Sequence, residues 1–156
     1  MSFVAKRMTR SHTIQINASP ETVFPLFTPL GEKKWVEGWE PRMLYPPSGE
    51  AMEGTVFITR QPGEADTIWN ILNFSPEIFR VKYARVTPGS RFGIVEVRCE
   101  KAGRDRSRVQ VTYIFTALSE EGNKFIDGFS EAYFSDYIDS WGVALNRFLA
   151  KNIPQD

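Results

Sequence analysis

Large aromatic side chains are the residues of this sequence with the clearest chemical use. Tyrosine and tryptophan each combine an apolar surface of about 150–250 Å² with one polar group that needs a partner. A cluster of them suits a cavity that holds an apolar ligand through a few polar contacts. Ordinary packing in the core is the alternative for each member. The candidate ligand-binding residues are Trp39, Trp69, Tyr83, Tyr113, Phe129, Tyr133, Tyr137 and Trp141.

Acid or base chemistry would fall to a glutamate, with Glu37, Glu40 and Glu96 as the catalytic candidates. Glu96 shares one face of its predicted strand with Ile94 and Arg98, because side chains alternate along a strand. If that face is concave, Glu96 is a partly buried proton acceptor. The alternative is a solvent-facing ion pair between Glu96 and an arginine of a neighbouring strand.

The chain has one histidine, His12, and one cysteine, Cys99. No serine, cysteine or carboxylate is fixed beside His12 in the sequence, so a strand residue at a sheet edge is the alternative to a general base. Cys99 falls on a predicted strand, where cysteine is usually a small core residue rather than a nucleophile. A single residue of each type excludes an internal disulfide and the usual Cys/His zinc sites. We therefore expect no metal and no cofactor.

Composition favours one cytoplasmic domain. The 156 residues, 42% of them apolar, suffice for one core and predict a single domain over 1–156. Lys+Arg 19 balances Asp+Glu 19, so no global field would hold a nucleic acid. No window approaches the roughly 20 apolar residues of a membrane span. Because no apolar run of signal-peptide length follows residues 1–10, we expect a cytoplasmic protein without a membrane span.

The beginning of the chain indicates a strand and two short helices. Alternating apolar residues predict a strand over 11–17. In Ser19-Pro20, the serine offers an oxygen to the free amides of a first helical turn, and the proline loses nothing there by lacking an N–H group. Pro25 should shorten this helix. Thr28-Pro29 repeats the signal and predicts a second helix that ends near Val36.

Two tryptophans surround a glycine in the segment that follows, residues 35–41. The Pro-rich stretch at 45–49 must be a loop, because proline cannot donate a hydrogen bond to a strand ladder. A loop that holds two such large aromatic side chains is expected to fold over something apolar.

A run of strands fills the middle of the chain. Short connections rich in glycine, proline and serine separate them, and parallel neighbours would need much longer crossovers. The sequence therefore predicts an antiparallel meander. The five predicted strands cover 55–61, 67–74, 78–86, 91–100 and 107–118.

The spacing of apolar residues predicts one long helix over 123–152. It would span about 40 Å at 1.5 Å per residue, and Asn152 with Pro154 provides the stop signal. Residues three or four apart share a helix face. The predicted apolar face consists of Ile126, Phe129, Tyr133, Tyr137, Trp141, Ala144, Leu145 and Phe148.

The order of these motifs resembles the START-like, helix-grip superfamily, often called SRPBCC domains, which includes the birch pollen allergen and polyketide cyclase-like proteins. The segments at 14–24, 35–41 and 119–123 carry the resemblance. It implies an α+β fold, in which a curved antiparallel sheet wraps around a long C-terminal helix and two short helices after the first strand close a hydrophobic cavity. The superfamily has no shared catalytic motif, so no functional residue is carried over.

We therefore expect a lipid, polyketide, aromatic or quinone-like ligand, hydrophobic or amphipathic, to bind between the sheet and the last helix. One alternative is a cyclase, dehydratase or hydrolase that acts on a polyketide-like or aromatic substrate, with Glu96 or Glu37 as the base. Another is a protein-interaction domain that resembles the chaperone activators of the superfamily. A homodimer stays open as an assembly.

Overall fold

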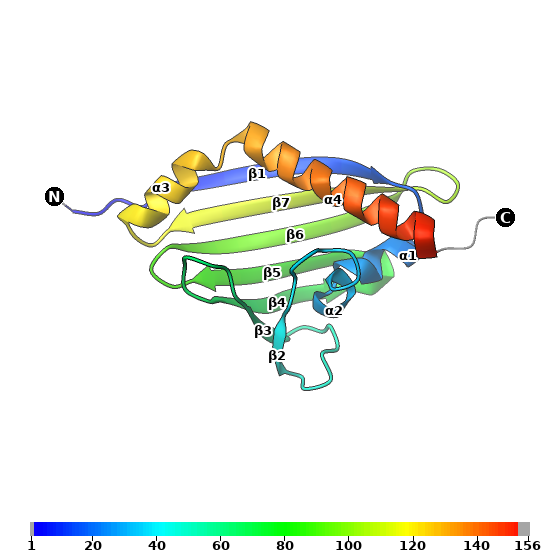
Figure 1. Cartoon of the computed structure of the whole chain (residues 1–156), viewed down its shortest axis with the longest axis horizontal. Coiled ribbons are helices and arrows are strands. Elements are labelled where there is room, and N and C mark those ends of the chain that lie inside the picture. Colours follow the sequence, from blue (N-terminus) through cyan, green and yellow to red (C-terminus); the bar gives the residue numbers. More distant parts are fainter. Residues whose placement is uncertain (1, 153–156) are drawn as a thin grey trace.

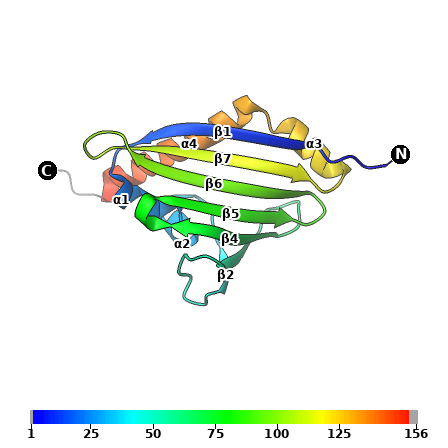
Figure 2. The same ribbon diagram turned by 180° about the vertical axis from the view of Figure 1, so that it is seen from behind.

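The computed structural model describes residues 2–152 and shows one seven-stranded antiparallel sheet with a long helix across it (Figures 1 and 2). The strand order is β1-β7-β6-β5-β4-β3-β2. This confirms the predicted α+β helix-grip fold. The strands are β1 (Arg7–Ile16), β2 (Arg42–Tyr45), β3 (Val56–Thr59), β4 (Thr67–Ser75), β5 (Arg80–Thr87), β6 (Arg91–Lys101) and β7 (Ser107–Ala117).

Two edge regions of the sheet differ from the prediction. β1 begins at Arg7 rather than near residue 11, and its first residues pair with the end of β7. β2 was not predicted, because it is only four residues long and prolines lie next to both of its ends. It pairs with β3 alone, at the sheet edge, where neighbouring prolines interrupt no second ladder.

Side chains alternate between the two faces of β6 and β7, the longest strands. On β6, Val95, Val97 and Cys99 are buried on the face toward the C-terminal helix. Tyr83 of β5 lies opposite Val95 in the ladder and shares that face. The inward face of the sheet is therefore the concave wall of the molecule, and the intervening residues form the convex outer face.

Short helices follow β1 as predicted. They are α1 (Pro20–Val23), the 3₁₀ helix η1 (Phe24–Phe27) and α2 (Pro29–Glu32), and a second 3₁₀ helix, η2 (Pro76–Ile78), connects β4 to β5. Pro25 ends the α-helical hydrogen bonding, as expected. The Thr28 hydroxyl accepts a hydrogen bond from the Gly31 amide at 3.0 Å, whereas the Ser19 side chain makes no such bond. α2 ends at Glu32, before the predicted Val36, and the chain continues in turns.

The predicted single helix over 123–152 is wrong, because the chain forms two helices here. α3 (Glu120–Gly128) ends at Phe129, whose ψ of 66° is not helical, and α4 (Glu131–Asn152) begins afresh. The Ser130 hydroxyl accepts a hydrogen bond from the Tyr133 amide at 3.0 Å and so caps α4. Arg10 of β1 donates a hydrogen bond to the Phe129 carbonyl at 3.1 Å. Pro154 lies outside the described residues.

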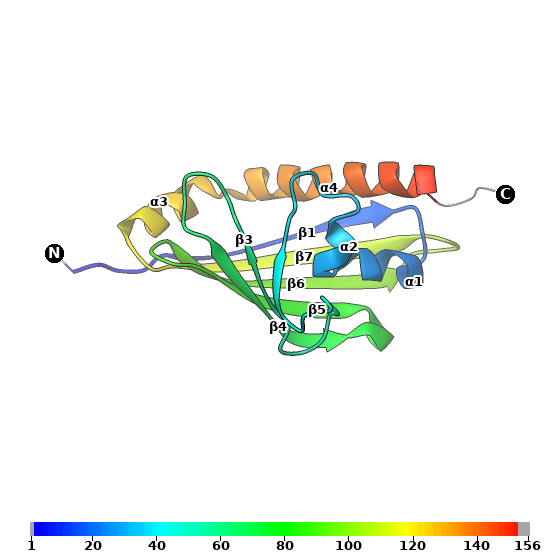
Figure 3. The same ribbon diagram turned by 60° about the horizontal axis from the view of Figure 1, so that its bottom comes forward.

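The core is filled unevenly along the sheet. Below α3, an aromatic cluster closes the space, with ring centroids 5.2–6.2 Å apart between Tyr113 and each of Phe115, Phe129 and Phe134. Figure 3 shows the twist of the sheet, and α2 with the loop that follows it on the same side as α4. The cavity lies beside the C-terminal part of α4, away from α3.

Candidate ligand-binding cavity

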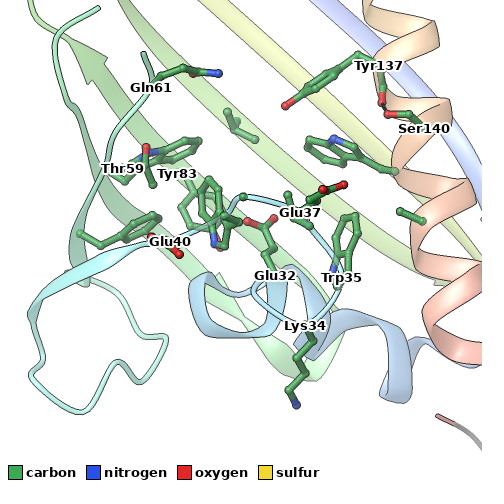
Figure 4. Close-up of a pocket in the computed structure, with 18 of the residues that line it drawn as sticks. Glu32, Lys34, Trp35, Glu37, Glu40, Thr59, Gln61, Tyr83, Tyr137 and Ser140 are labelled. Atoms are coloured by element: carbon green, nitrogen blue, oxygen red, sulfur yellow. Dashed lines mark hydrogen bonds between the residues drawn. The ribbon is translucent and has the colours of Figure 1, made fainter. Parts of the chain in front are cut away.

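A cavity of about 1090 Å³ opens between the sheet and α4. Its walls come from the loop after α2, from β3, from inward residues of β4–β7 and from the second half of α4. Figure 4 shows Tyr137 reaching into it from α4 and Glu32 from α2. The cavity lining combines residues from Glu32 to Asn152, which are far apart in the sequence.

Most of the predicted aromatic set lines this cavity. Tyr83 and Tyr113 come from the sheet floor, and the Trp69 ring stacks on Phe57 of β3 at 5.5 Å. The members that line the cavity are Trp39, Trp69, Tyr83, Tyr113, Tyr137 and Trp141. Their role in ligand binding stays a prediction at this point.

Phe129 and Tyr133 lie outside the cavity. Phe129 is buried in the aromatic cluster, with its ring 5.5 Å from that of Phe125. Tyr133 is 54% exposed, so the expectation that it faces the interior is wrong. Phe129 caps the end of α3 and Tyr133 lies in the first turn of α4, so the two do not share one continuous helix as the prediction assumed.

α4 has two adjacent stripes with different roles. Its fully packed stripe lies along β1 and is mainly aliphatic, consisting of Phe134, Ile138, Gly142, Leu145 and Leu149. Tyr137, Trp141 and Ala144 lie beside that stripe and line the cavity. The predicted apolar face joined parts of both stripes. A helix that lies against one edge strand therefore turns its aromatic flank toward an open space.

The segment at residues 35–41, here called the tryptophan loop, folds over the apolar lining of the cavity. The sequence predicted that this loop folds over something apolar. The Trp35 indole N–H donates to the Leu26 carbonyl at 2.8 Å, and the Trp39 indole N–H donates to the Pro29 carbonyl at 2.8 Å. These bonds tie the loop to η1 and α2. The Trp39 ring then lies 5.8 Å from that of Trp69, edge to face. Both indole donors are satisfied, so the rings present mainly apolar surface to the cavity.

Glu96 is on the wrong side of the sheet for cavity chemistry. Val95 and Val97 line the cavity, and alternation places Glu96 between them on the convex face. There its carboxylate forms ion pairs with Arg98 and with Lys82, the latter at 3.7 Å. The alternative of a solvent-facing ion pair is thus the correct one, although the partners come from β5 and from β6 itself. Glu96 cannot serve as the base.

Glu37 and Glu40 lie on the loop at the mouth of the cavity and are exposed. Figure 4 shows Glu37 above Glu32 in the same view. Glu32, at the end of α2, was not a predicted site residue. It is half-buried, and burial raises the pKa of its carboxyl group well above the usual value. Nothing in the sequence around Glu32, which is followed by two lysines, indicated that its side chain turns inward.

Arg85 is the second cavity residue that the sequence analysis missed. It follows Tyr83 by two positions on β5 and lines the cavity. Its guanidinium carbon lies 4.4 Å from the centroid of the Trp69 ring. Burial lowers the pKa of Arg85. Strand alternation could have identified this residue, because Val81, Tyr83 and Thr87 share its parity and are buried.

Three tyrosine hydroxyls reach the cavity region. The Tyr83 hydroxyl donates to the Phe27 carbonyl at 2.7 Å and is thereby committed to the fold. Burial raises the pKa values of Tyr113 and Tyr137, so both phenols keep their protons and remain donors. Tyr113 and Tyr137 line the same cavity as Arg85.

The other titratable candidates lie away from the cavity. The His12 Nε2 atom is 2.7 Å from Asp139 Oδ1, between β1 and α4. Cys99 is buried in the core, and burial raises the pKa of its thiol to about 12. Within residues 2–152, no three His, Cys, Asp or Glu side chains come together as metal ligands. No helix in the same range is long and apolar enough to cross a membrane.

The sequence matches the profile of a known family. The family described as polyketide cyclase / dehydrase and lipid transport matches residues 7–144. No curated protein matches the chain.

Solved structures with a similar fold come from several organisms. Norcoclaurine synthase from Thalictrum flavum, in complex with dopamine and hydroxybenzaldehyde, is 13% identical with a TM-score of 0.68. The match covers 97% of this chain and 90% of the synthase chain. A solution NMR structure from Thermobifida fusca is 13% identical with a TM-score of 0.69, over 95% and 97%. The Mll3558 protein from Rhizobium loti is 16% identical with a TM-score of 0.60, over 94% and 100%. At these identities the likeness shows the fold alone.

Proposed function

Because this chain belongs to the polyketide cyclase / dehydrase and lipid transport family, we propose that it binds a small hydrophobic or amphipathic molecule between its sheet and α4. The ligand is the cargo or the substrate of the protein. Lipids, polyketides, and aromatic or quinone-like compounds fit this description. Norcoclaurine synthase, which shares the fold, has been solved with two small aromatic molecules, dopamine and hydroxybenzaldehyde.

One observation carries the proposal, namely the aromatic lining of the 1090 Å³ cavity. The chain has four tryptophans, and all of them, Trp35, Trp39, Trp69 and Trp141, line this one space. Aromatic rings that are held in place lose little conformational entropy when a ligand packs on them. An empty apolar wall of this size would be costly, and a bound apolar molecule removes that surface from water.

Binding can be tested with N-phenyl-1-naphthylamine, an uncharged aromatic probe whose emission rises in an apolar environment. Ala144 of α4 is half-buried and lines the cavity, so Ala144→Trp places a large ring in the binding space. We expect the wild type to bind the probe in a saturable manner and Ala144→Trp to bind it at least about ten-fold more weakly, a loss of roughly 1.4 kcal/mol.

Ala150→Trp is the matched control, because Ala150 is exposed on α4 and outside the cavity lining. It should bind the probe as the wild type does. If Ala144→Trp does not fold, as circular dichroism would show, Ser140→Trp offers an exposed position on the same wall. A wild type that does not bind the probe, or a filled cavity that binds it normally, would contradict the proposal.

A second candidate function is proton transfer to or from the bound molecule, with Glu32 as the acid or base. The observation in its favour is the position of this carboxyl group in the cavity together with its raised pKa (Figure 4). A carboxyl group that keeps its proton to a higher pH than an exposed glutamate can act as a general acid, and its conjugate base is a stronger proton acceptor.

Carbon-13 NMR of the glutamate carboxyl groups tests this second function. One resonance should titrate at higher pH than the others and should be missing in Glu32→Gln. If every glutamate titrates in the ordinary range, Glu32 has no special acid–base role, and the binding proposal stands without it.

A further inference from the structure

Arg85 is placed on the concave wall of the cavity without a counter-charge. None of the salt bridges among residues 2–152 includes it. Its Nε atom is buried and has no hydrogen-bond partner. Burying a charged group costs free energy unless an opposite charge or hydrogen bonds offset it. Among residues 2–152, the Arg85 charge is therefore offset by no salt bridge.

Arg91, on the next strand, is an inward-facing arginine that does form a salt bridge, and it serves as the comparison for Arg85. It is also on the concave face and is 4% exposed, yet Glu64 accepts two hydrogen bonds from it at 3.0 and 3.2 Å. Its guanidinium carbon lies 3.6 Å from the centroid of the Phe125 ring, in the filled part of the core. The Nε atom of Arg91 is buried without a hydrogen-bond partner, like that of Arg85. The two residues differ in charge pairing, because Arg91 has both an aromatic and an acidic partner, whereas Arg85 has only aromatic ones.

Aromatic rings hold the Arg85 guanidinium in one orientation. Its carbon is 4.4 Å from the Trp69 ring centroid and 5.5 Å from that of Phe115. Stacking satisfies the flat faces of a guanidinium and leaves the N–H groups of its edge to a planar anion. The group is therefore oriented before any ligand arrives.

Two hydroxyl donors line the same cavity as Arg85. These are Tyr113 and Tyr137, and burial raises the pKa of both phenols, so both keep their protons. Within residues 2–152 no acidic side chain of the cavity lining forms an ion pair with Arg85, and Asp66 pairs with Arg60. An anionic group at Arg85 would thus meet an unpaired cation in a cavity that also offers phenol donors.

From this arrangement, and resting on the proposed function, we propose that the ligand is an amphipathic anion whose acidic group binds to Arg85 while its apolar body packs on the aromatic wall. A carboxylate or another monoanionic oxyacid matches the edge of the guanidinium. In this proposal the acidic group and the apolar body belong to one molecule, so both enter the cavity together.

Two probes that differ by one acidic group test the proposal. 8-Anilinonaphthalene-1-sulfonate has the aromatic body of N-phenyl-1-naphthylamine with a sulfonate added. Arg85→Met should weaken sulfonate-probe binding by about ten-fold or more, the range expected for lost hydrogen bonds to a charged group. Binding of the uncharged probe should change less than about three-fold. Arg80→Met on the exposed, opposite face of β5 is the matched control and should change neither.

Competition identifies the kind of anion. Decanoate should displace the sulfonate probe from the wild type, and acetate at the same concentration should not. Equal competition by acetate would mean that a free anion suffices and would overturn the amphipathic assignment. If Arg85→Met fails to fold, Arg85→Lys keeps the charge without the planar fork and should bind the sulfonate probe with intermediate affinity.

The outcomes separate this inference from the proposed function. If the wild type binds neither probe, the proposed function fails. If the wild type binds both probes but Arg85→Met loses both equally or loses neither, the cavity binds ligands and Arg85 is not the anion site.

Discussion

Glu32 couples the stability of the protein to pH at the scale of a single residue. Burial raises the pKa of this carboxyl group, so the folded state holds the proton more tightly than the unfolded state. The stabilising contribution is complete below the unfolded pKa of about 4.3 and is lost as the pH rises through the folded pKa. Stability should therefore fall with rising pH in the wild type, relative to a variant that has no such carboxyl group.

Glu32→Gln is that variant. Urea unfolding between about pH 4 and pH 8 should show the wild type losing free energy of unfolding relative to Glu32→Gln as the pH rises. Glu40→Gln, an exposed change on the loop that follows α2, should keep the wild-type pH dependence. Parallel curves for the wild type and Glu32→Gln would show that the carboxyl group is solvated in the folded protein.

Tyr137 and Tyr133 are four residues apart on α4 but should respond differently to truncation. Tyr137 lines the cavity, with its ring edge to face at 5.3 Å from that of Trp141, whereas Tyr133 lies outside the cavity lining. Tyr137→Ala should weaken binding of N-phenyl-1-naphthylamine by roughly ten-fold, since an aromatic ring contact is worth about 1–1.5 kcal/mol. Tyr133→Ala should leave it unchanged. Equal effects of both changes would argue that the probe binds outside the cavity.

The aromatic residues that line the cavity were easier to predict than the charged residues that line it. Trp39, Trp69 and Trp141 were expected to line a cavity because most of the surface of a large aromatic side chain is apolar, and all three do line it. The position of Glu96 stayed open because alternation along β6 gives two faces but does not say which is concave. Arg85 was missed for a related reason, because a charged residue at an inward position contradicts the hydrophobic pattern on which the prediction depends.

The break between α3 and α4 is the main feature at the scale of secondary structure. The apolar spacing continues across Gly128 and Phe129, so periodicity predicted one helix. The local signal was a glycine followed two residues later by a serine, a common pairing of a helix end and a helix cap. The spacing of apolar residues indicates which side chains face the sheet, whereas capping residues indicate where the helical hydrogen bonds stop.

Ser130→Ala tests this cap. Loss of the hydrogen bond from the Tyr133 amide should lower the free energy of unfolding by about 1 kcal/mol. Ser135→Ala, inside α4, should be neutral or slightly stabilising, because alanine is the better helix former. Chemical denaturation measures both. A neutral Ser130→Ala would mean that packing alone fixes the start of α4.

Two buried glycines should respond in opposite directions to the addition of one methyl group. At Gly142 of α4, a Cβ atom would lie 3.6 Å from Ile14, an ordinary contact, so Gly142→Ala should stabilise the protein by about 0.5–1 kcal/mol. At Gly93 of β6, it would lie 2.6 Å from the Phe115 ring, so Gly93→Ala should destabilise the protein by about 1–3 kcal/mol. Thermal unfolding of both variants measures the contrast, and equal signs would contradict the described packing.

At the scale of the whole molecule, the order of elements and the presence of a cavity were predicted, whereas the volume of the cavity was not. Short turns fixed the antiparallel meander, and strand alternation fixed its two faces. The volume of the cavity depends on how far β3 and the tryptophan loop stand from α4, which is a property of sheet curvature. No single residue encodes that curvature, so the aromatic residues and the family resemblance indicated a cavity but not its volume.

Proton–nitrogen NMR of the labelled protein during titration with N-phenyl-1-naphthylamine tests the central claim most directly. Each of the four tryptophans contributes one indole N–H signal, and all four side chains line the cavity. We predict that the indole signals shift together and saturate with the probe, while the amides of Glu96 and Arg98 at the convex face stay in place. Shifts confined to convex-face amides, with unmoved indole signals, would contradict ligand binding between the sheet and α4.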